Sequence, residues 1–306
     1  MSFEYLTRKN TFIKKYEYGE NIVGFGEYVL RFASSCPLGC LYCYLRDVNK
    51  QKHEPKIYTN FEMLRKELIE LCGPVNGKRN LYLNAGENTD SLVFEPQAGI
   101  IKFLDEFISE FKPDLMIELR TKTDNIPSLR SMVNKHKFII SFSLSPQSVI
   151  DKYEPGTASL EKRLDAMREC QTMGYSVGFR FEPIINSGQL IKEYKKILEI
   201  SDEKLLFKNP EKIHSIGLSC IRWTKGLMKK IREEGSVDGS ELLLDEFVLC
   251  PDKKFRYFRV IRTNIYRRIL SLLHDFVKLD NPADKSDKIF LSTEPAYIWQ
   301  DCGLDF

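Results

Sequence analysis

Three cysteines fall within eight consecutive residues of the chain, at Cys36, Cys40 and Cys43, with the spacing C-x3-C-x2-C. They come just after a β-branched and aromatic segment, 27–33, which predicts a strand. Thiols spaced this closely in a chain of 306 residues are typical of metal ligation. The fold must therefore place a loop after an early strand that gathers three thiols at one point.

Short β-branched or aromatic segments alternate with longer segments of helical period up to about residue 220. This order predicts six βα units around a parallel sheet, too few for a closed eight-stranded barrel. No Gly-x-Gly-x-x-Gly follows a strand, so the sequence favours a partial barrel over an open dinucleotide-binding sheet. We predict an α/β fold, a partial (β/α)6 TIM-like barrel with a C-terminal extension. The predicted strands are 27–33, 80–84, 115–120, 137–143, 176–181 and 213–219, and the clearest helices are 61–71, 97–111 and 159–173.

The predicted barrel core covers 20–220, and the extension covers 221–306. No linker-like composition separates the two, so we expect the extension to pack on the barrel and close its open side. Within the extension, 251–268 carries seven Lys or Arg against one Asp. Basic and aromatic residues alternate there, which suits phosphate contact and base stacking, although a solvated helix face backed by core aromatics is an equal alternative. The candidate substrate contacts are Arg256, Tyr257 and Arg259.

Composition limits the class of protein further. A formal charge of +3 excludes a uniformly basic nucleic-acid protein. No apolar run approaches the roughly 18 residues of a membrane span, and the first ten residues lack the apolar stretch of a signal peptide. We therefore predict a cytoplasmic protein without membrane contact, in which the eight cysteines are reduced thiols or metal ligands.

The ligand set favours iron and sulfur over zinc. A structural zinc ion needs a fourth Cys or His, and His53 is the only candidate nearby. Three thiolates suit a 4Fe-4S cluster in which one iron keeps an open position for a substrate or cofactor.

A cluster loop after the first strand of a partial barrel resembles the radical S-adenosylmethionine superfamily, whose signature has an aromatic residue before the third cysteine. Tyr42 supplies this residue. The resemblance implies S-adenosylmethionine as cofactor, and Gly86-Glu87 after the second strand resembles the element that receives the methionine ammonium.

Other candidate cofactor contacts follow from barrel geometry, because ligands bind where the strands end. Lys122 offers a cation for the carboxylate of the cofactor. Ser141 or Ser143 offers a hydroxyl for the cofactor's ribose, and the alternation of side chains along a strand puts both serines on one face of the sheet. Arg180 is either a further cofactor contact or, paired with Glu182, a structural group.

Several segments together resemble the spore photoproduct lyase family. The quoted matches are C-P-L-G-C-L-Y-C-Y-L from Cys36, E-L-R-T-K-T-D-N from Glu118, Y-E-P-G-T from Tyr153, G-Y-S-V-G-F-R-F-E-P-I from Gly174, K-F-R-Y-F from Lys254 and S-T-E-P-A-Y-I-W from Ser292. The resemblance implies an adenosyl radical that takes hydrogen from a thymine dimer in DNA, and Tyr42 and Tyr44 match the family's catalytic tyrosines. It also implies an external one-electron reductant of the flavodoxin or ferredoxin type, and a monomer.

One position departs from the family. Its hydrogen-donor cysteine is replaced by Glu87, and a carboxylate O–H is a far poorer hydrogen-atom donor than a thiol. We expect Glu87 to bind the methionine ammonium, since Gly86 permits close backbone approach; the alternative is a place facing the substrate. The departure keeps open a radical enzyme acting on RNA, a nucleoside or a peptide, and a cluster-bearing nucleic-acid-binding module without turnover.

Overall fold

The computed structural model describes residues 3–48, 54–73, 80–233, 240–277 and 288–305. Its main sheet has eight strands, all parallel to their neighbours except the last, which pairs antiparallel at one edge. Across the sheet the order is β15 (Ile289–Leu291), β11 (Ile213–Cys220), β10 (Ser176–Ile184), β9 (Phe138–Ser143), β8 (Leu115–Thr121), β7 (Leu81–Ala85), β4 (Tyr28–Leu30) and β2 (Ile13–Lys15).

The predicted partial barrel is confirmed, since its six strands form the centre of this sheet. Within the described residues the sheet ends at β15 and β2, which do not pair with each other, so it curls without closing. The sequence analysis missed both edge strands, because each has only three residues and gives little periodicity. It also made the first strand too long: β4 ends at Leu30, and β5 (Ala33–Ser34) belongs to another small sheet with β6 (Lys56–Tyr58) and β1 (Glu4–Leu6).

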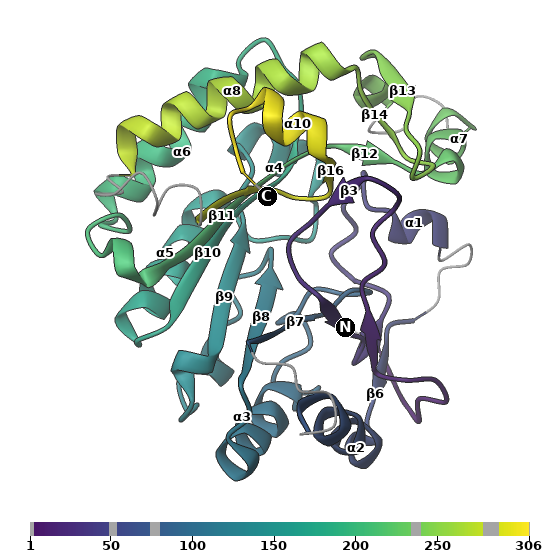
Figure 1. Ribbon diagram of the computed structural model, residues 1–306, viewed down its shortest axis with the longest axis vertical. Helices are drawn as coiled ribbons and strands as arrows, with labels where there is room; N and C mark the ends of the chain where they lie inside the picture. The colour runs from purple at the N-terminus through teal and green to yellow at the C-terminus, as the bar shows by residue number, and fades with distance from the viewer. Residues whose placement is uncertain (1–2, 49–53, 74–79, 234–239, 278–287, 306) are drawn as a thin grey trace.

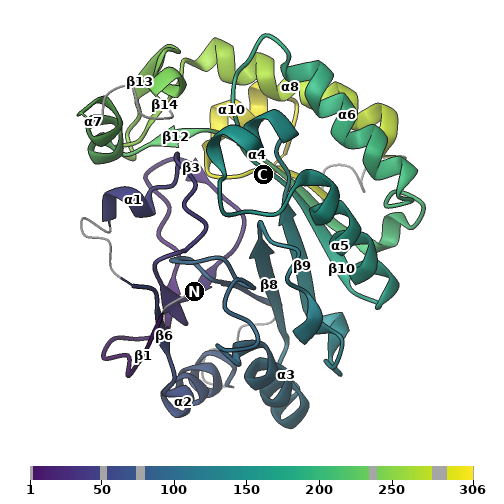
Figure 2. The ribbon, with the colours of Figure 1, turned by 180° about the vertical axis from the view of Figure 1, so that it is seen from behind.

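The longer helices cover the outer rim of the curled sheet (Figures 1 and 2). They are α2 (Phe61–Cys72), α3 (Ile100–Phe111), α5 (Leu160–Thr172), α6 (Leu190–Glu203) and α8 (Arg259–Phe276). Apolar residues three and four apart bury one face of each, as Leu64, Leu68 and Leu71 do in α2. Helix α5 begins where predicted, because the Ser159 side chain accepts a hydrogen bond from the amide of Lys162. The shorter helices are α1 (Leu45–Val48), α4 (Gln147–Tyr153), α7 (Lys225–Glu233) and α10 (Ala296–Asp301).

The inner face of the sheet is polar. Strand alternation turns the leucines of β7 away from Tyr82 and Asn84, and Asn84 lies opposite Glu118 of β8. Ser141 of β9 lies opposite Arg120 on one side and Gly178 on the other. The barrel therefore encloses a set of charged and hydroxyl side chains.

The N-terminal segment crosses the open side of the sheet (Figure 1). There, β3 (Ile22–Val23) pairs antiparallel with β16 (Glu294–Pro295). Phe25 follows β3 and stacks on Phe290 of edge strand β15, with ring centroids 4.4 Å apart. The C-terminal segment was predicted to close the open side of the barrel. In the structure both ends of the chain cover this side, because β3 of the N-terminal segment pairs with β16 of the C-terminal segment.

The C-terminal part adds a small antiparallel sheet, β12 (Arg222–Trp223), β14 (Phe255–Tyr257) and β13 (Phe247–Leu249). Helix α8 packs on α6, and β15 joins the barrel, so this part is continuous with the core. The division near residue 220 stays a prediction. In the part of the chain that the structure describes, no helix has both the length and the apolar character to cross a lipid bilayer.

Candidate active site

The three cysteines lie on a loop between β5 and α1, beyond the carboxyl end of the first parallel strand. Positive φ angles at Ser35 and Gly39 turn the backbone, and the amide of Cys43 donates to the carbonyl of Cys40 at 3.1 Å. Cys40 is buried, and the other two thiol residues are half-buried. The local turn therefore brings the three thiols under partial cover.

The thiols are close enough to act on one another. Burial raises the pKa of Cys36 and Cys40 to about 12 and also raises the pKa of Cys43. Cys43 adds to the rise at both other thiols. Lys122 opposes it by lowering the pKa of Cys40 and Cys43. Because metals bind thiolates, this lysine favours the form that ligates.

The three thiols match the protein ligands of a 4Fe-4S cluster that keeps one iron open. Among the described residues, no group of three His, Cys, Asp or Glu side chains is arranged to hold one metal ion. In a 4Fe-4S cluster each thiolate binds its own iron, so the thiols stand farther apart than the ligands of one ion. Three mutually interacting thiols beside a lysine fit that group. His53, the candidate fourth zinc ligand, lies outside the described residues.

Gly86 and Glu87 form a tight turn after β7. Gly86 has φ of +97°, and a Cβ there would lie 2.9 Å from Ser91 Oγ, so this turn requires glycine. The Glu87 carboxylate accepts a hydrogen bond from Arg31 Nε. The backbone carbonyl of Glu87 accepts a second hydrogen bond, from the Tyr44 hydroxyl at 2.6 Å. The cysteine loop and the Glu87 turn therefore meet through Tyr44. The cofactor and catalytic roles of these residues stay predictions.

Lys122 and Tyr42 are also brought together. The Lys122 ammonium lies 5.6 Å from the centre of the Tyr42 ring. It donates to Glu154 Oε1 at 3.3 Å and to the carbonyl of Glu182 at 3.2 Å. The Tyr42 hydroxyl donates to the same carboxylate oxygen of Glu154. Two predicted site residues thus share a partner to which the sequence analysis gave no role.

The two candidate serines face the barrel interior, as alternation predicts. Ser141 lies opposite Gly178 and is fully buried, whereas Ser143 lies opposite Arg180 and is partly exposed. Of the two, Ser143 is the more accessible to a ligand. Contact of either serine with a ribose stays a prediction.

Arg180 is paired differently from the expectation. Its guanidinium lies 2.6 Å from Glu118 of β8, and it also donates to the hydroxyl and the carbonyl of Ser215. Glu182 instead lies 3.6 Å from Arg120. The expected pairing of Arg180 with Glu182 is wrong, because Arg180 pairs instead with Glu118 of β8, two strands away in the sheet. The geometry of Arg180 favours the structural alternative.

The three candidate substrate contacts separate into two groups. Arg256 is fully buried and binds both oxygens of Asp252, at 2.5 and 2.7 Å. Tyr257 is also buried, and its hydroxyl accepts the amide of Asn186. Arg259 is exposed at the start of α8. The first two are covered because β14 is the central strand of the small sheet, so only Arg259 of the three is exposed, and its contact with a substrate stays a prediction.

Sequence reasoning missed one buried carboxylate that shapes the site. Asp90 follows the Glu87 turn and accepts the amides of Leu92 and Lys122 and the hydroxyl of Thr121. Asp90 therefore connects the turn after β7 to the end of β8, and it holds the backbone of Lys122 in place there. An Asp within a turn after a strand is the available signal, since Asp side chains commonly bind nearby backbone amides.

A partial parallel barrel with a three-thiol loop beyond its first strand defines a protein of the radical S-adenosylmethionine class. Within that class, the model of the family described as spore photoproduct lyase matches residues 13–255. The chain belongs to the spore photoproduct lyase family.

The chain is similar to curated proteins named spore photoproduct lyase. It is 27% identical to the one from Clostridium acetobutylicum, over 58% of this chain and 52% of the relative, and 27% identical to the one from Bacillus subtilis, over 72% and 63%. The chain therefore spans about half to under two thirds of these relatives. A solved spore photoproduct lyase mutant with bound AdoMet and dinucleoside spore photoproduct superposes with a TM-score of 0.78 at 19% identity, covering 94% of this chain and 81% of the other.

Proposed function

We propose that the protein is a radical S-adenosylmethionine enzyme that acts on a thymine-dimer lesion in DNA or a related nucleic-acid substrate. The observation that carries the proposal is the meeting of three interacting thiols with Lys122 at the carboxyl ends of the barrel strands. The curated relatives are spore photoproduct lyases by name, and the similar solved structure holds a dinucleoside spore photoproduct. Both findings support this substrate class.

In this proposal Cys36, Cys40 and Cys43 hold a 4Fe-4S cluster. Such a cluster, once reduced by an external flavodoxin or ferredoxin, supplies the electron that converts S-adenosylmethionine to a 5′-deoxyadenosyl radical. Lys122 contributes positive charge beside the thiolates and the cofactor carboxylate. The turn at Gly86 exposes backbone for the methionine end, and Ser143 offers a hydroxyl to the ribose.

A nucleic-acid contact is supported by one exposed surface of the C-terminal part. Arg259 stacks over the Tyr297 ring at 4.8 Å, and Phe258 beside them is 47% exposed. Helix α7, from the same C-terminal part, is tied to α1 through Thr224 and Asp47 at 2.5 Å. Because α1 directly follows the cysteine loop, the C-terminal part contacts the segment beside the thiols, and its exposed cation and aromatic rings suit contact with a nucleic acid. We further propose that the protein works in the cytoplasm as a monomer.

The substitution at Glu87 favours a second candidate, in which the radical acts on a nucleoside, RNA or peptide that needs no thiol donor. Glu87 is an acceptor for Arg31, not a hydrogen donor. The nearest O–H to this position in the described network is that of Tyr44, bound to the Glu87 carbonyl. If the lesion is the substrate, Tyr44 is the residue placed to return the hydrogen.

The test is an anaerobic assay of the reconstituted protein with dithionite and S-adenosylmethionine, with and without dinucleoside spore photoproduct. We expect 5′-deoxyadenosine in both cases and conversion of the photoproduct to its two undamaged thymidine units only with the lesion. Formation of 5′-deoxyadenosine without any lesion turnover supports the second candidate. Absence of cofactor cleavage from protein with a full cluster overturns the enzyme proposal.

A further inference from the structure

The loop that follows α4 packs directly against the cysteine loop. The amide of Leu41 donates to the carbonyl of Tyr153 at 2.9 Å, and the amide of Gly156 donates to the carbonyl of Leu38 at 3.0 Å. A Cβ at Gly156 would lie 2.6 Å from the Leu38 oxygen, so only glycine allows this approach. The two bonds bracket Glu154.

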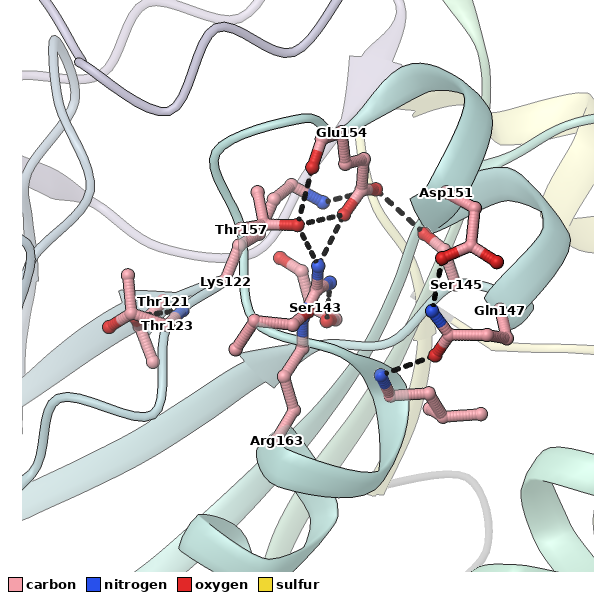
Figure 3. A network of polar contacts seen from close by, with 12 residues as sticks. Thr121, Lys122, Thr123, Ser143, Ser145, Gln147, Asp151, Glu154, Thr157 and Arg163 are labelled. Carbon is pink, nitrogen blue, oxygen red and sulfur yellow. Dashed lines mark hydrogen bonds and ion pairs between the residues drawn. The ribbon is translucent and has the colours of Figure 1, made fainter.

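The Glu154 side chain sits inside this contact and is fully buried. Figure 3 shows four of the donors that converge on it, namely Lys122, Ser145, Thr157 and Arg163. One oxygen accepts Tyr42, Ser145 at 3.1 Å and Lys122 at 3.3 Å. The other accepts Arg163 at 2.5 Å and Thr157 at 3.3 Å. A buried carboxylate with this many donors holds all of them in one geometry.

The charges in this cluster do not cancel. Arg163 is fully buried, bonds to Glu154 and to two backbone carbonyls, and so neutralises the carboxylate. Burial alone would raise the pKa of Glu154, but Lys122 and Arg163 outweigh it and lower this pKa to about 2. With Arg163 assigned to Glu154, the positive charge of Lys122 remains available to the thiolates on the neighbouring loop.

We infer that Glu154 is a positioning residue that docks the cysteine loop through Tyr42 and fixes Lys122 over the ring of Tyr42, which lies between Cys40 and Cys43 in the sequence. The inference rests on the proposed function for the use of this arrangement, which is to present a preformed thiol set and a fixed cation to the cluster. The arrangement itself is a property of the folded chain and can be measured without turnover.

The first measurement is amide hydrogen exchange of Leu41 in the full-length protein before cluster reconstitution. Glu154→Gln should accelerate exchange at Leu41 at least tenfold, because the neutral side chain no longer balances Arg163 and Lys122. Glu241→Gln is the matched control, since Glu241 accepts the Tyr153 hydroxyl at 2.7 Å from the outer side of the same loop. This control substitution should leave the exchange rate of the Leu41 amide unchanged. Equal protection of Leu41 in Glu154→Gln and the native protein overturns the inference.

The second measurement separates charge placement from loop support. Glu154→Gln removes a negative charge, so the midpoint potential of the reconstituted cluster should shift to more positive values. Gly156→Ala displaces the loop but keeps every charge, and should accelerate exchange at Leu41 with a smaller shift in potential. An unchanged potential in Glu154→Gln refutes the electrostatic part of the inference.

If Glu154→Gln does not fold, Tyr42→Phe provides the same test in milder form. It removes one donor to Glu154 and retains the charges, so exchange at Leu41 should rise severalfold; no rise contradicts the docking role. Failure of the native protein to cleave S-adenosylmethionine would refute the proposed function and leave these exchange results standing.

Discussion

Arg31 Nε donates a hydrogen bond to the carboxylate of Glu87, and both side chains are about one quarter exposed. The pair joins the residue after β4 to the turn after β7, at the position where the family resemblance led us to expect a donor cysteine. One carboxylate oxygen of Glu87 is therefore engaged by a cation of the protein itself. This fixes the orientation of the carboxylate at the mouth of the site.

If Glu87 receives the methionine ammonium, Glu87→Gln should weaken binding of S-adenosylmethionine about tenfold, because a charge-assisted hydrogen bond becomes a neutral one. Formation of 5′-deoxyadenosine without lesion should fall as well. Equilibrium dialysis of the reconstituted protein measures the first effect. Glu110→Gln, which breaks a surface pair with Arg65, is the control. Unchanged affinity with intact cofactor cleavage would place Glu87 on the substrate side, where Glu87→Cys should improve dimer repair.

The cluster assignment predicts a sharp division among the cysteines. Replacing Cys36, Cys40 or Cys43 by Ala should abolish the visible absorption of the reconstituted protein and all cleavage of the cofactor, because each thiolate binds a separate iron. Cys72→Ala should keep both, since Cys72 ends helix α2 and lies outside the loop. Iron and sulfide analysis of each variant checks the result. Retained absorption in any loop variant, or bound zinc, contradicts the assignment.

Stability should depend on pH through Glu118. Burial alone would raise its pKa, but Arg120 and Arg180 outweigh burial and lower the pKa to about 2. Because the folded value lies below the ordinary value near 4.5, the folded chain binds fewer protons than the unfolded chain in this interval. The ionised Glu118 therefore contributes about 3 kcal/mol to the free energy of unfolding. This contribution is complete above pH 5 and is lost as pH falls toward 2.

Urea unfolding between pH 3 and pH 7 measures this dependence. Glu118→Gln should lower the free energy of unfolding at pH 7 by about 3–5 kcal/mol, because it leaves Arg180 buried without its counter-charge. It should also flatten the pH profile. Glu62→Gln, in the first turn of helix α2, should retain the native profile. A Glu118→Gln profile as steep as the native one would show that other carboxylates set the acid limit.

The parts of the fold that the sequence predicted are those with a local signal. The central strands carry runs of β-branched and aromatic residues, and Ser159 marks the start of α5, so both were predictable. The strands β15 and β3 could not be predicted from the sequence. Each is two or three residues long and is defined by its partner, which lies far away in the sequence.

The site divides in the same way. The spacing of the cysteines is local, so the loop could be identified from the sequence. The partner of Arg180 depends on how the strands are arranged in the sheet, and a charge pattern along one segment does not contain that information. Asp252 lies only four residues from Arg256, but the second partner of Arg256, Glu294, comes from a distant segment. Glu154 stood in a quoted motif, but its five donors come from five different segments, so its place at the centre of the site required the three-dimensional structure.

The basic segment of the C-terminal part gives the last prediction, because its arginines have two different roles. Arg259 is exposed, and its partner Asp301 is an exchangeable surface carboxylate at 2.7 Å. Arg259→Ala should therefore weaken DNA binding and reduce the slope of log affinity against log salt by about 1, with no change in melting temperature. Arg256→Ala should instead unfold the small sheet, because it leaves Asp252 without its cation and removes one of the two arginines beside buried Glu294. Fluorescence titration of a DNA duplex at several salt concentrations, with a thermal melt of each variant, separates the two. A stable Arg256→Ala protein that loses DNA affinity would return Arg256 to the substrate surface.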